Sequence, residues 1–185
     1  MQFERLTIFD VVKITPKKYV DNRGYFMETF RRNEFSKFIG RQVNFVQENQ
    51  SLSLPAFTIR GLHFQSPPHP QGKLVRCTQG AIIDVAVDAR QGSSTYGQHV
   101  TAELTAKNSC QLWVPEGFLH GFVTLEANTE VQYKCTDYYS AECDGNILWN
   151  DSTLNINWAI DPLHAILSDK DKDAPLFKDF HTPFI

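Results

Sequence analysis

Apolar and polar residues alternate in short stretches along most of this 185-residue chain. Stretches rich in β-branched and aromatic residues predict strands at Phe3 to Ile14, Lys73 to Thr78, Ala81 to Asp88, Gln98 to Leu104, Cys110 to Val114, Gly121 to Leu125 and Glu130 to Thr136. Helical spacing is confined to Glu34 to Phe38 and to the tail near Asp169 to Phe177. Many short strands with regular breaks predict an all-β fold, either a sandwich, a jelly roll or a barrel.

The pair Gln79-Gly80 separates two of these predicted strands and reads as a two-residue hairpin turn. In that register Val75 faces Asp84, and Asp84 lies diagonally beside Lys73 on the same face. Such a pair is either a surface ion pair, which contributes little to stability, or a lysine held in place inside a ligand cavity.

The stretch Arg60-Gly-Leu-His-Phe-Gln65 places an imidazole beside a guanidinium and a glycine. If it is a strand, alternation puts Gly61, His63 and Gln65 on one face and Arg60, Leu62 and Phe64 on the other. His63 then lines whatever the first face covers. Its side chain is either hydrogen-bonded within a half-buried strand or catalytic, and only its surroundings decide.

Composition narrows the class of protein. The length predicts a single domain over residues 1–185, and 42% hydrophobic with 21% charged residues is typical of a soluble globular protein. A net charge of -3 argues against nucleic-acid binding, although a few local cations could still hold a small anion. Neither a signal-peptide pattern nor an apolar run of roughly 18 residues is present, so we expect a cytoplasmic protein. The four cysteines form no C-x-x-C pair that would indicate zinc or dithiol chemistry.

Nine motifs occur in order along the chain: Asp21-Asn-Arg-Gly-Tyr-Phe-Met-Glu28, Phe45-Val-Gln-Glu-Asn-Gln-Ser-Leu-Ser53, Arg60-Gly-Leu-His-Phe-Gln65, Gln71-Gly-Lys-Leu-Val75, Asp84-Val-Ala-Val-Asp88, Val114-Pro-Glu-Gly-Phe-Leu-His-Gly-Phe122, Thr136-Asp-Tyr-Tyr139, Trp149-Asn-Asp151 and Leu167-Ser-Asp-Lys-Asp171. With these motifs the chain resembles the dTDP-4-dehydrorhamnose 3,5-epimerases over nearly its whole length. Each motif alone is weak, but their order and spacing together are specific.

The resemblance implies a cupin-like jelly roll and a homodimer in which each partner lends a strand and side chains to the other's site. It also implies that the enzyme uses no metal and no cofactor. Metal-binding cupins commonly carry an H-x-H pair followed by a glutamate, and none of the six histidines here forms such a pair.

The family's substrate, dTDP-4-dehydro-6-deoxy-D-glucose, has a ketone at carbon 4, so the hydrogens on carbons 3 and 5 can leave as protons. Inverting both carbons gives dTDP-4-dehydro-L-rhamnose, a step towards L-rhamnose for surface polysaccharide. The resemblance implies that His63 is the base, that Asp171 orients it, and that Lys73 stabilises the enolate. Asp84 could position Lys73.

The returning proton needs a donor on the opposite face of the sugar. The resemblance favours Tyr133, although spacing alone does not distinguish it from Tyr138 or Tyr139. Tyr139 is also expected to support the site. His120 is either a turn histidine or a hydrogen-bonding group of the sugar pocket. The residues expected to bind the nucleotide sugar, some of them across the dimer, are Arg23, Glu28, Gln47, Asn49, Arg60, His120, Asp144 and Lys170.

Three alternatives remain open from the sequence. A relative that inverts only one carbon, or that moves the ketone between carbons 3 and 4, would keep most of these residues. A non-catalytic cupin that binds a sugar nucleotide is a third possibility. A binding module, however, does not need an acid and a base on opposite faces of its ligand.

Overall fold

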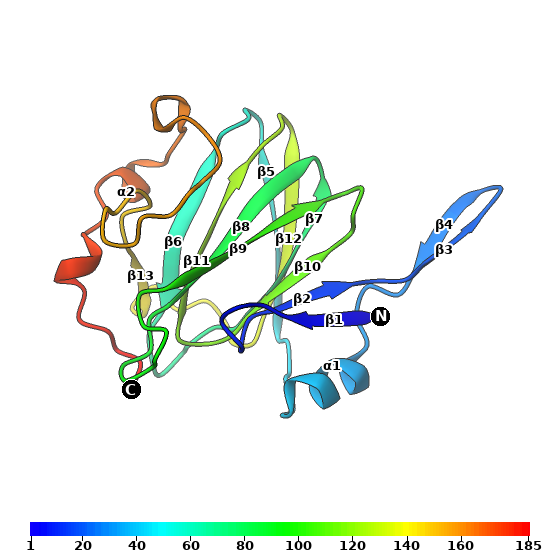
Figure 1. The fold of residues 1–185 in the computed structure, drawn as a ribbon, viewed down its shortest axis with the longest axis horizontal. Helices are drawn as coiled ribbons and strands as arrows, with labels where there is room; N and C mark the ends of the chain where they lie inside the picture. The colour runs from blue at the N-terminus through cyan, green and yellow to red at the C-terminus, as the bar shows by residue number, and fades with distance from the viewer.

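The computed structural model describes residues 1–185, and its strands form two facing antiparallel sheets (Figure 1). The six-stranded sheet has the order β1 (Gln2–Arg5), β2 (Val12–Thr15), β10 (Gln111–Val114), β7 (Lys73–Gln79), β12 (Thr129–Cys135) and β5 (Gln47–Ser53). The five-stranded sheet has the order β13 (Asp144–Asn146), β6 (Ile59–Gln65), β11 (Phe118–Thr124), β8 (Ala81–Asp88) and β9 (His99–Thr105).

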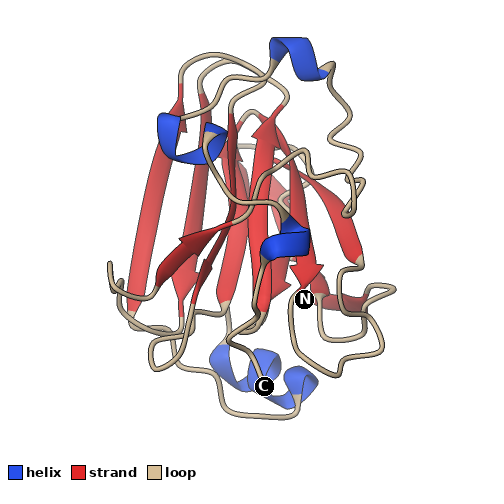
Figure 2. Cartoon of the chain, turned by 90° about the vertical axis from the view of Figure 1, so that its left-hand side faces the viewer, coloured by secondary structure: helices blue, strands red, loops and turns tan.

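The helices are short and lie outside the two sheets (Figure 2). They are α1 (Arg32–Ile39), α2 (Asp169–Lys172) and two 3-10 turns, Pro162–His164 and Phe177–Asp179. The all-β fold class is therefore confirmed. Six of the predicted strand segments form β7, β8, β9, β10, β11 and β12, and the first, Phe3 to Ile14, forms β1 and β2 joined by a turn.

Apolar side chains from both sheets meet in the space between them. The buried cluster there contains Val75, Ile82, Leu112, Phe122 and Val131. A second cluster covers the other face of the five-stranded sheet, where the C-terminal segment packs its tryptophans and phenylalanines against β6, β8 and β11. Because the core fills only part of the space between the sheets, a cavity remains beside it.

The predicted hairpin between Lys73–Thr78 and Ala81–Asp88 is wrong. β7 pairs with β10 and β12, whereas β8 pairs with β9 and β11 in the other sheet. Both are central strands whose apolar side chains meet across the core, so the chain crosses between the sheets at Gly80. A Cβ there would lie 2.3 Å from Thr129 Oγ1, and its φ is +78°. Val75 and Asp84 are consequently not cross-strand neighbours.

The pairing of β6 with β11 contains a bulge at Gly61. His120 pairs with His63 and Phe122 with Arg60, so that Gly61 and Leu62 together oppose Gly121. The strands approach so closely that a Cβ on Gly61 would lie 2.5 Å from the Gly121 Cα. The bulge breaks the alternation of side chains, and Arg60 and His63 line the same cavity. The prediction that they point to opposite faces is therefore wrong.

A two-stranded hairpin, β3 (Lys18–Asp21) and β4 (Gly24–Met27), projects away from the sandwich (Figure 1). It exposes four large apolar side chains: Tyr19, Val20, Tyr25 and Phe26. No helix in the structure has the length and apolar character needed to cross a bilayer.

Candidate active site

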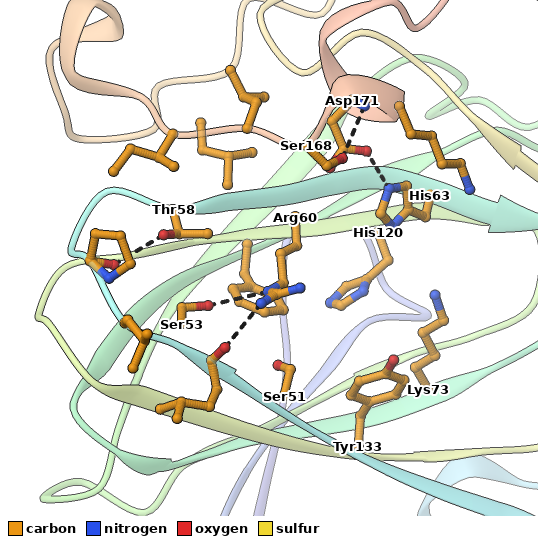
Figure 3. A pocket seen from close by; sticks show the side chains of 18 residues that line it. Ser51, Ser53, Thr58, Arg60, His63, Lys73, His120, Tyr133, Ser168 and Asp171 are labelled. Carbon is orange, nitrogen blue, oxygen red and sulfur yellow. Dashed lines mark hydrogen bonds and ion pairs between the residues drawn. The ribbon is translucent and has the colours of Figure 1, made fainter.

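The cavity between the sheets has two adjoining parts, with volumes of about 540 and 450 Å³. His63, Lys73, Tyr133 and Lys170 line both parts, so they lie where the two parts meet. Figure 3 shows His63, His120, Tyr133 and Lys73 gathered around one space, although they come from four strands of two sheets. Their convergence is a consequence of the fold and not of sequence spacing.

His63 is paired with a buried carboxylate. Its Nε2 lies 2.6 Å from Asp171 Oδ1, and the His63 side chain is 30% exposed while that of Asp171 is 4% exposed. Ser168 caps α2, and its hydroxyl donates to Asp171 Oδ2 at 3.0 Å. Burial acts to raise the pKa of Asp171, but the hydrogen bond and charge of His63 outweigh it and the pKa is lowered. Asp171 therefore faces the imidazole as a carboxylate.

A second histidine–carboxylate pair lies in the next strands of the same sheet. His120 Nε2 is 2.8 Å from Asp84 Oδ1, and both side chains are buried. The other oxygen of Asp84 has no hydrogen-bond partner. Asp84 was expected to position Lys73; its direct contact is with His120 instead, and it acts on Lys73 only through its charge. This correction follows from the placement of β7 and β8 in different sheets.

Lys73 brings a positive charge into the interior. Burial lowers the pKa of Lys73, while the surrounding groups Cys135, Asp144 and Asp84 act in the opposite direction. Its ammonium nitrogen lies 6.0 Å from the centre of the Tyr133 ring. Burial also raises the pKa of Tyr133, which keeps the phenol protonated and able to donate. A cation and a neutral donor thus border the same space as the His63–Asp171 pair.

The 450 Å³ part of the cavity has a polar lining. Gln47 donates to Asn49 at 3.0 Å and accepts from the Tyr139 backbone N–H at 2.9 Å. Asp144 accepts hydrogen bonds from Lys170 and, at 3.3 Å, from the Tyr139 hydroxyl. These five predicted residues are therefore together in one part of the site. They offer amide groups and one cation to a polar ligand.

Arg60 lies in the larger part of the cavity. Its Nε donates to Ser53 Oγ at 3.2 Å and its Nη2 donates to the Leu52 carbonyl oxygen at 3.1 Å. These two bonds from β5 fix the orientation of the guanidinium group (Figure 3). The third guanidinium nitrogen, Nη1, is left for a ligand.

Two predicted binding residues do not line this cavity. Arg23 lies at the turn of the projecting hairpin, where it pairs with Asp21 at 2.6 Å. Glu28 follows β4 and lies 3.6 Å from Arg31. Neither borders either part of the cavity in its own chain.

Sequence reasoning missed several lining residues, namely Ser51, Ser53, Gln71, Phe122, Ile166, Leu167 and Ser168. For one of them, Ser168, the sequence does contain a pattern that predicts its place beside Asp171. Ser168-Asp-Lys-Asp171 has the form of a helix N-cap followed three residues later by an acidic residue. That pattern predicts a serine hydroxyl beside Asp171. Ser51 and Ser53 sit on β5, whose polar sequence gave no strand signal, and Gln71, Ile166 and Leu167 lie in loops. Phe122 lies on β11, which was predicted as a strand, but nothing in the sequence marked its side chain as facing the cavity.

The arrangement suits proton transfer at a carbon next to a carbonyl group. It offers a base with its carboxylate, a buried cation and a protonated phenol around one space. Within the structure no three His, Cys, Asp or Glu side chains cluster in a way that could hold a metal ion.

Comparison with known proteins adds to this geometry. The family model for dTDP-4-dehydrorhamnose 3,5-epimerase matches residues 5–179. A dTDP-4-dehydrorhamnose 3,5-epimerase of Sinorhizobium fredii is 52% identical over 95% of this chain and 89% of its own length. The crystal structure of dTDP-6-deoxy-D-glucose-3,5-epimerase from Legionella pneumophila, in complex with dTDP-4-keto-L-rhamnose, has a TM-score of 0.94 and 40% identity, covering 100% of this chain and 98% of that one. A 3'-monoepimerase from Streptomyces bikiniensis, in complex with dTDP-quinovose, has a TM-score of 0.86 and 30% identity over 92% of this chain and 85% of that one.

Proposed function

The chain belongs to the dTDP-4-dehydrorhamnose 3,5-epimerase family, and we propose that the cavity residues carry out this family's reaction by acid–base proton transfer through an enolate. The protein is an isomerase, a dTDP-4-dehydrorhamnose 3,5-epimerase of dTDP-L-rhamnose biosynthesis. The observation that carries the mechanism is the gathering of His63–Asp171, Lys73 and Tyr133 around one cavity.

His63 is the base that removes the proton next to the ketone. Its Nε2 is bonded to Asp171, which leaves Nδ1 as the nitrogen available for the substrate. The buried carboxylate stabilises the imidazolium that forms when His63 takes the proton. Since each substrate proton is next to the ketone, the same base can serve at carbon 3 and at carbon 5 once the ring has moved or flipped.

Lys73 stabilises the negative charge that develops on the ketone oxygen. A buried ammonium group without a hydrogen-bonded carboxylate of its own can direct its charge to the enolate, and in a cavity shielded from water that interaction is strong. His120, held by Asp84, can donate a second hydrogen bond in the same space.

Tyr133 returns the proton on the opposite face of the sugar. It reaches the cavity from β12 in the six-stranded sheet, whereas His63 comes from β6 in the facing sheet. A planar enolate between the sheets would have the imidazole on one side and the phenol on the other. Inversion requires this arrangement, because protonation from the side of the base would restore the original configuration.

The nucleotide part of the substrate is assigned to the polar part of the cavity. Gln47, Asn49, Tyr139, Asp144 and Lys170 supply its hydrogen bonds, and Lys170, which borders both parts, supplies positive charge for the diphosphate. Arg60 borders only the larger part, so its contact with the diphosphate stays a prediction from the sequence.

Arg23 and Glu28 act on a neighbouring site in a homodimer. Their hairpin projects from the sandwich, and its side chains Tyr19, Val20, Tyr25 and Phe26 are between 52% and 78% exposed. Burying them against a second copy would remove this apolar surface from water.

The cytoplasmic location expected from the sequence stays a prediction.

Inversion at a single carbon is the second candidate, because a 3'-monoepimerase shares the fold at 30% identity. The greater identity to enzymes named 3,5-epimerases, up to 52%, favours inversion at both carbons. Movement of the ketone and a purely binding role have no such support.

The variant His63→Ala tests the role of the base. We expect it to stop hydrogen exchange at carbons 3 and 5 while dTDP binds with the affinity of the unchanged protein, because His63 contacts the sugar. The control is His164→Ala, which removes an imidazole outside the cavity that stacks on Phe57. Exchange at the normal rate in His63→Ala would overturn the assignment.

A further inference from the structure

One strand contributes a row of polar side chains along the whole cavity. The inward-facing positions of β5 are Gln47, Asn49, Ser51 and Ser53, and the side chains between them face outward and are exposed. Gln47 and Asn49 border the polar part of the cavity, and Ser51 and Ser53 border the larger part. Ser51 is therefore the polar group that follows Asn49 along the wall towards Arg60.

Three of these four side chains have hydrogen-bond partners within the protein. Gln47 and Asn49 are bonded to each other, and Asn49 also donates to Cys135 Sγ at 3.7 Å. Ser53 Oγ accepts from Arg60. The exception is Ser51, whose Oγ is buried and has no partner.

An unsatisfied hydroxyl in a protein interior is unfavourable, because water is excluded and nothing replaces it. The side chain itself is half-buried and faces the cavity between Arg60 and Tyr133 (Figure 3). Since Oγ makes no hydrogen bond in the free chain, rotation about χ1 to meet a ligand would break none. The ligand group it could meet lies beside Tyr133, where the proposed function places the hexose.

We propose that Ser51 hydrogen-bonds a ring hydroxyl of the bound hexose and thereby fixes how the sugar is presented to His63 and Tyr133. This inference rests on the proposed function, since it takes the larger part of the cavity as the sugar site. In this role Ser51 determines specificity for the hexose and does not contribute to binding of the nucleotide. Sites that hydrogen-bond a substrate hydroxyl discriminate against ligands that lack it.

Binding of two ligands separates this role from a structural one. The probes are dTDP, which has no hexose, and dTDP-quinovose, which carries a 6-deoxyhexose without the reactive ketone. For Ser51→Ala, calorimetry should give an unchanged Kd for dTDP and a Kd for dTDP-quinovose raised roughly 3- to 10-fold, the effect of losing one neutral hydrogen bond. Ser51→Thr keeps a hydroxyl and should recover most of the affinity. Ser94→Ala, on an exposed loop, is the matched control.

Thermal unfolding supplies the second readout. Ser51→Ala should unfold at the same temperature as the unchanged protein or higher, because no hydrogen bond of the free protein is lost. A lower unfolding temperature, equal losses for both ligands, or no loss for either would overturn the inference. Failure of the proposed function would be seen separately, in the unchanged protein, as an absence of turnover of dTDP-4-dehydro-6-deoxy-D-glucose.

Discussion

Replacing Asp171 with asparagine removes the charge that faces His63 while keeping nearly the same shape. The carboxylate oxygen lies 2.6 Å from His63 Nε2 in a side chain that is 4% exposed. Ser168 can still cap the helix and bond the new amide, because its hydroxyl both donates and accepts. The substitution therefore tests the electrostatic contribution of the carboxylate with little change in geometry.

The expected loss follows from the strength of this bond. A hydrogen bond to a charged group contributes about 1.5–3 kcal/mol. The imidazole is 30% exposed and so partly solvated, which favours the lower half of that range. At about 1.4 kcal/mol per factor of ten, kcat of Asp171→Asn should fall roughly 10- to 30-fold. The Kd for dTDP should not change, since Asp171 faces the sugar-binding part of the cavity.

Epimerisation rates measured by NMR between pH 6 and 9 would give this comparison. The control is Asp169→Asn in the same helix, whose carboxylate is 96% exposed and pairs only with Lys172. A kcat for Asp171→Asn within a factor of two of the unchanged enzyme would refute the reasoning that the carboxylate stabilises the imidazolium.

Three further substitutions test the electrostatics and the fold. Lys73→Met should lower kcat roughly 100- to 1000-fold through loss of enolate stabilisation. Because burial lowers the pKa of Lys73, its charged form is less favourable in the folded protein than in the unfolded chain. The variant should therefore also unfold at a higher temperature at pH 7, and a lower unfolding temperature would contradict this. Gly61→Ala should lower the free energy of unfolding in urea by roughly 2–4 kcal/mol, because a Cβ there would lie 2.5 Å from the facing strand. The control is Gly24→Ala, where no atom lies within 4 Å, and it should lower the free energy of unfolding by less. Equal losses in the two variants would exclude the steric explanation. Although burial opposes it, hydrogen bonding by Arg90 lowers the pKa of Asp88 to about 2, against roughly 3.9 in the unfolded chain. Asp88→Asn should therefore lose on the order of 2 kcal/mol of stability above about pH 5 and almost none at about pH 1 in denaturation curves. A loss of the same size at about pH 1 would point to packing instead.

Local patterns predicted most strands of the two large sheets but not how they pair. β8 and its neighbours are rich in β-branched residues, so their positions were readable from the sequence. Gly80 was equally compatible with a hairpin turn and with a crossing between sheets. Only the packing of Val75 and Ile82 across the core decides between them, and that is a long-range contact. β5 was missed because its sequence, QENQSLS, has a single apolar residue.

The site shows the same division between local and long-range information. The resemblance predicted catalytic roles for His63, Lys73, Tyr133 and Asp171, and in the structure all four line one cavity. Alternation placed Arg60 on the wrong face because the bulge at Gly61 is set by its contact with β11.

The central claim is that protons leave carbons 3 and 5 and return to the opposite face. The most direct test is NMR of the protein with dTDP-4-dehydro-6-deoxy-D-glucose in deuterated water, with no metal added, following each carbon separately. Deuterium incorporation with inversion at both carbons is the result that this account predicts. Exchange at one carbon alone would show a monoepimerase, and binding of the substrate without any exchange would contradict the catalytic account.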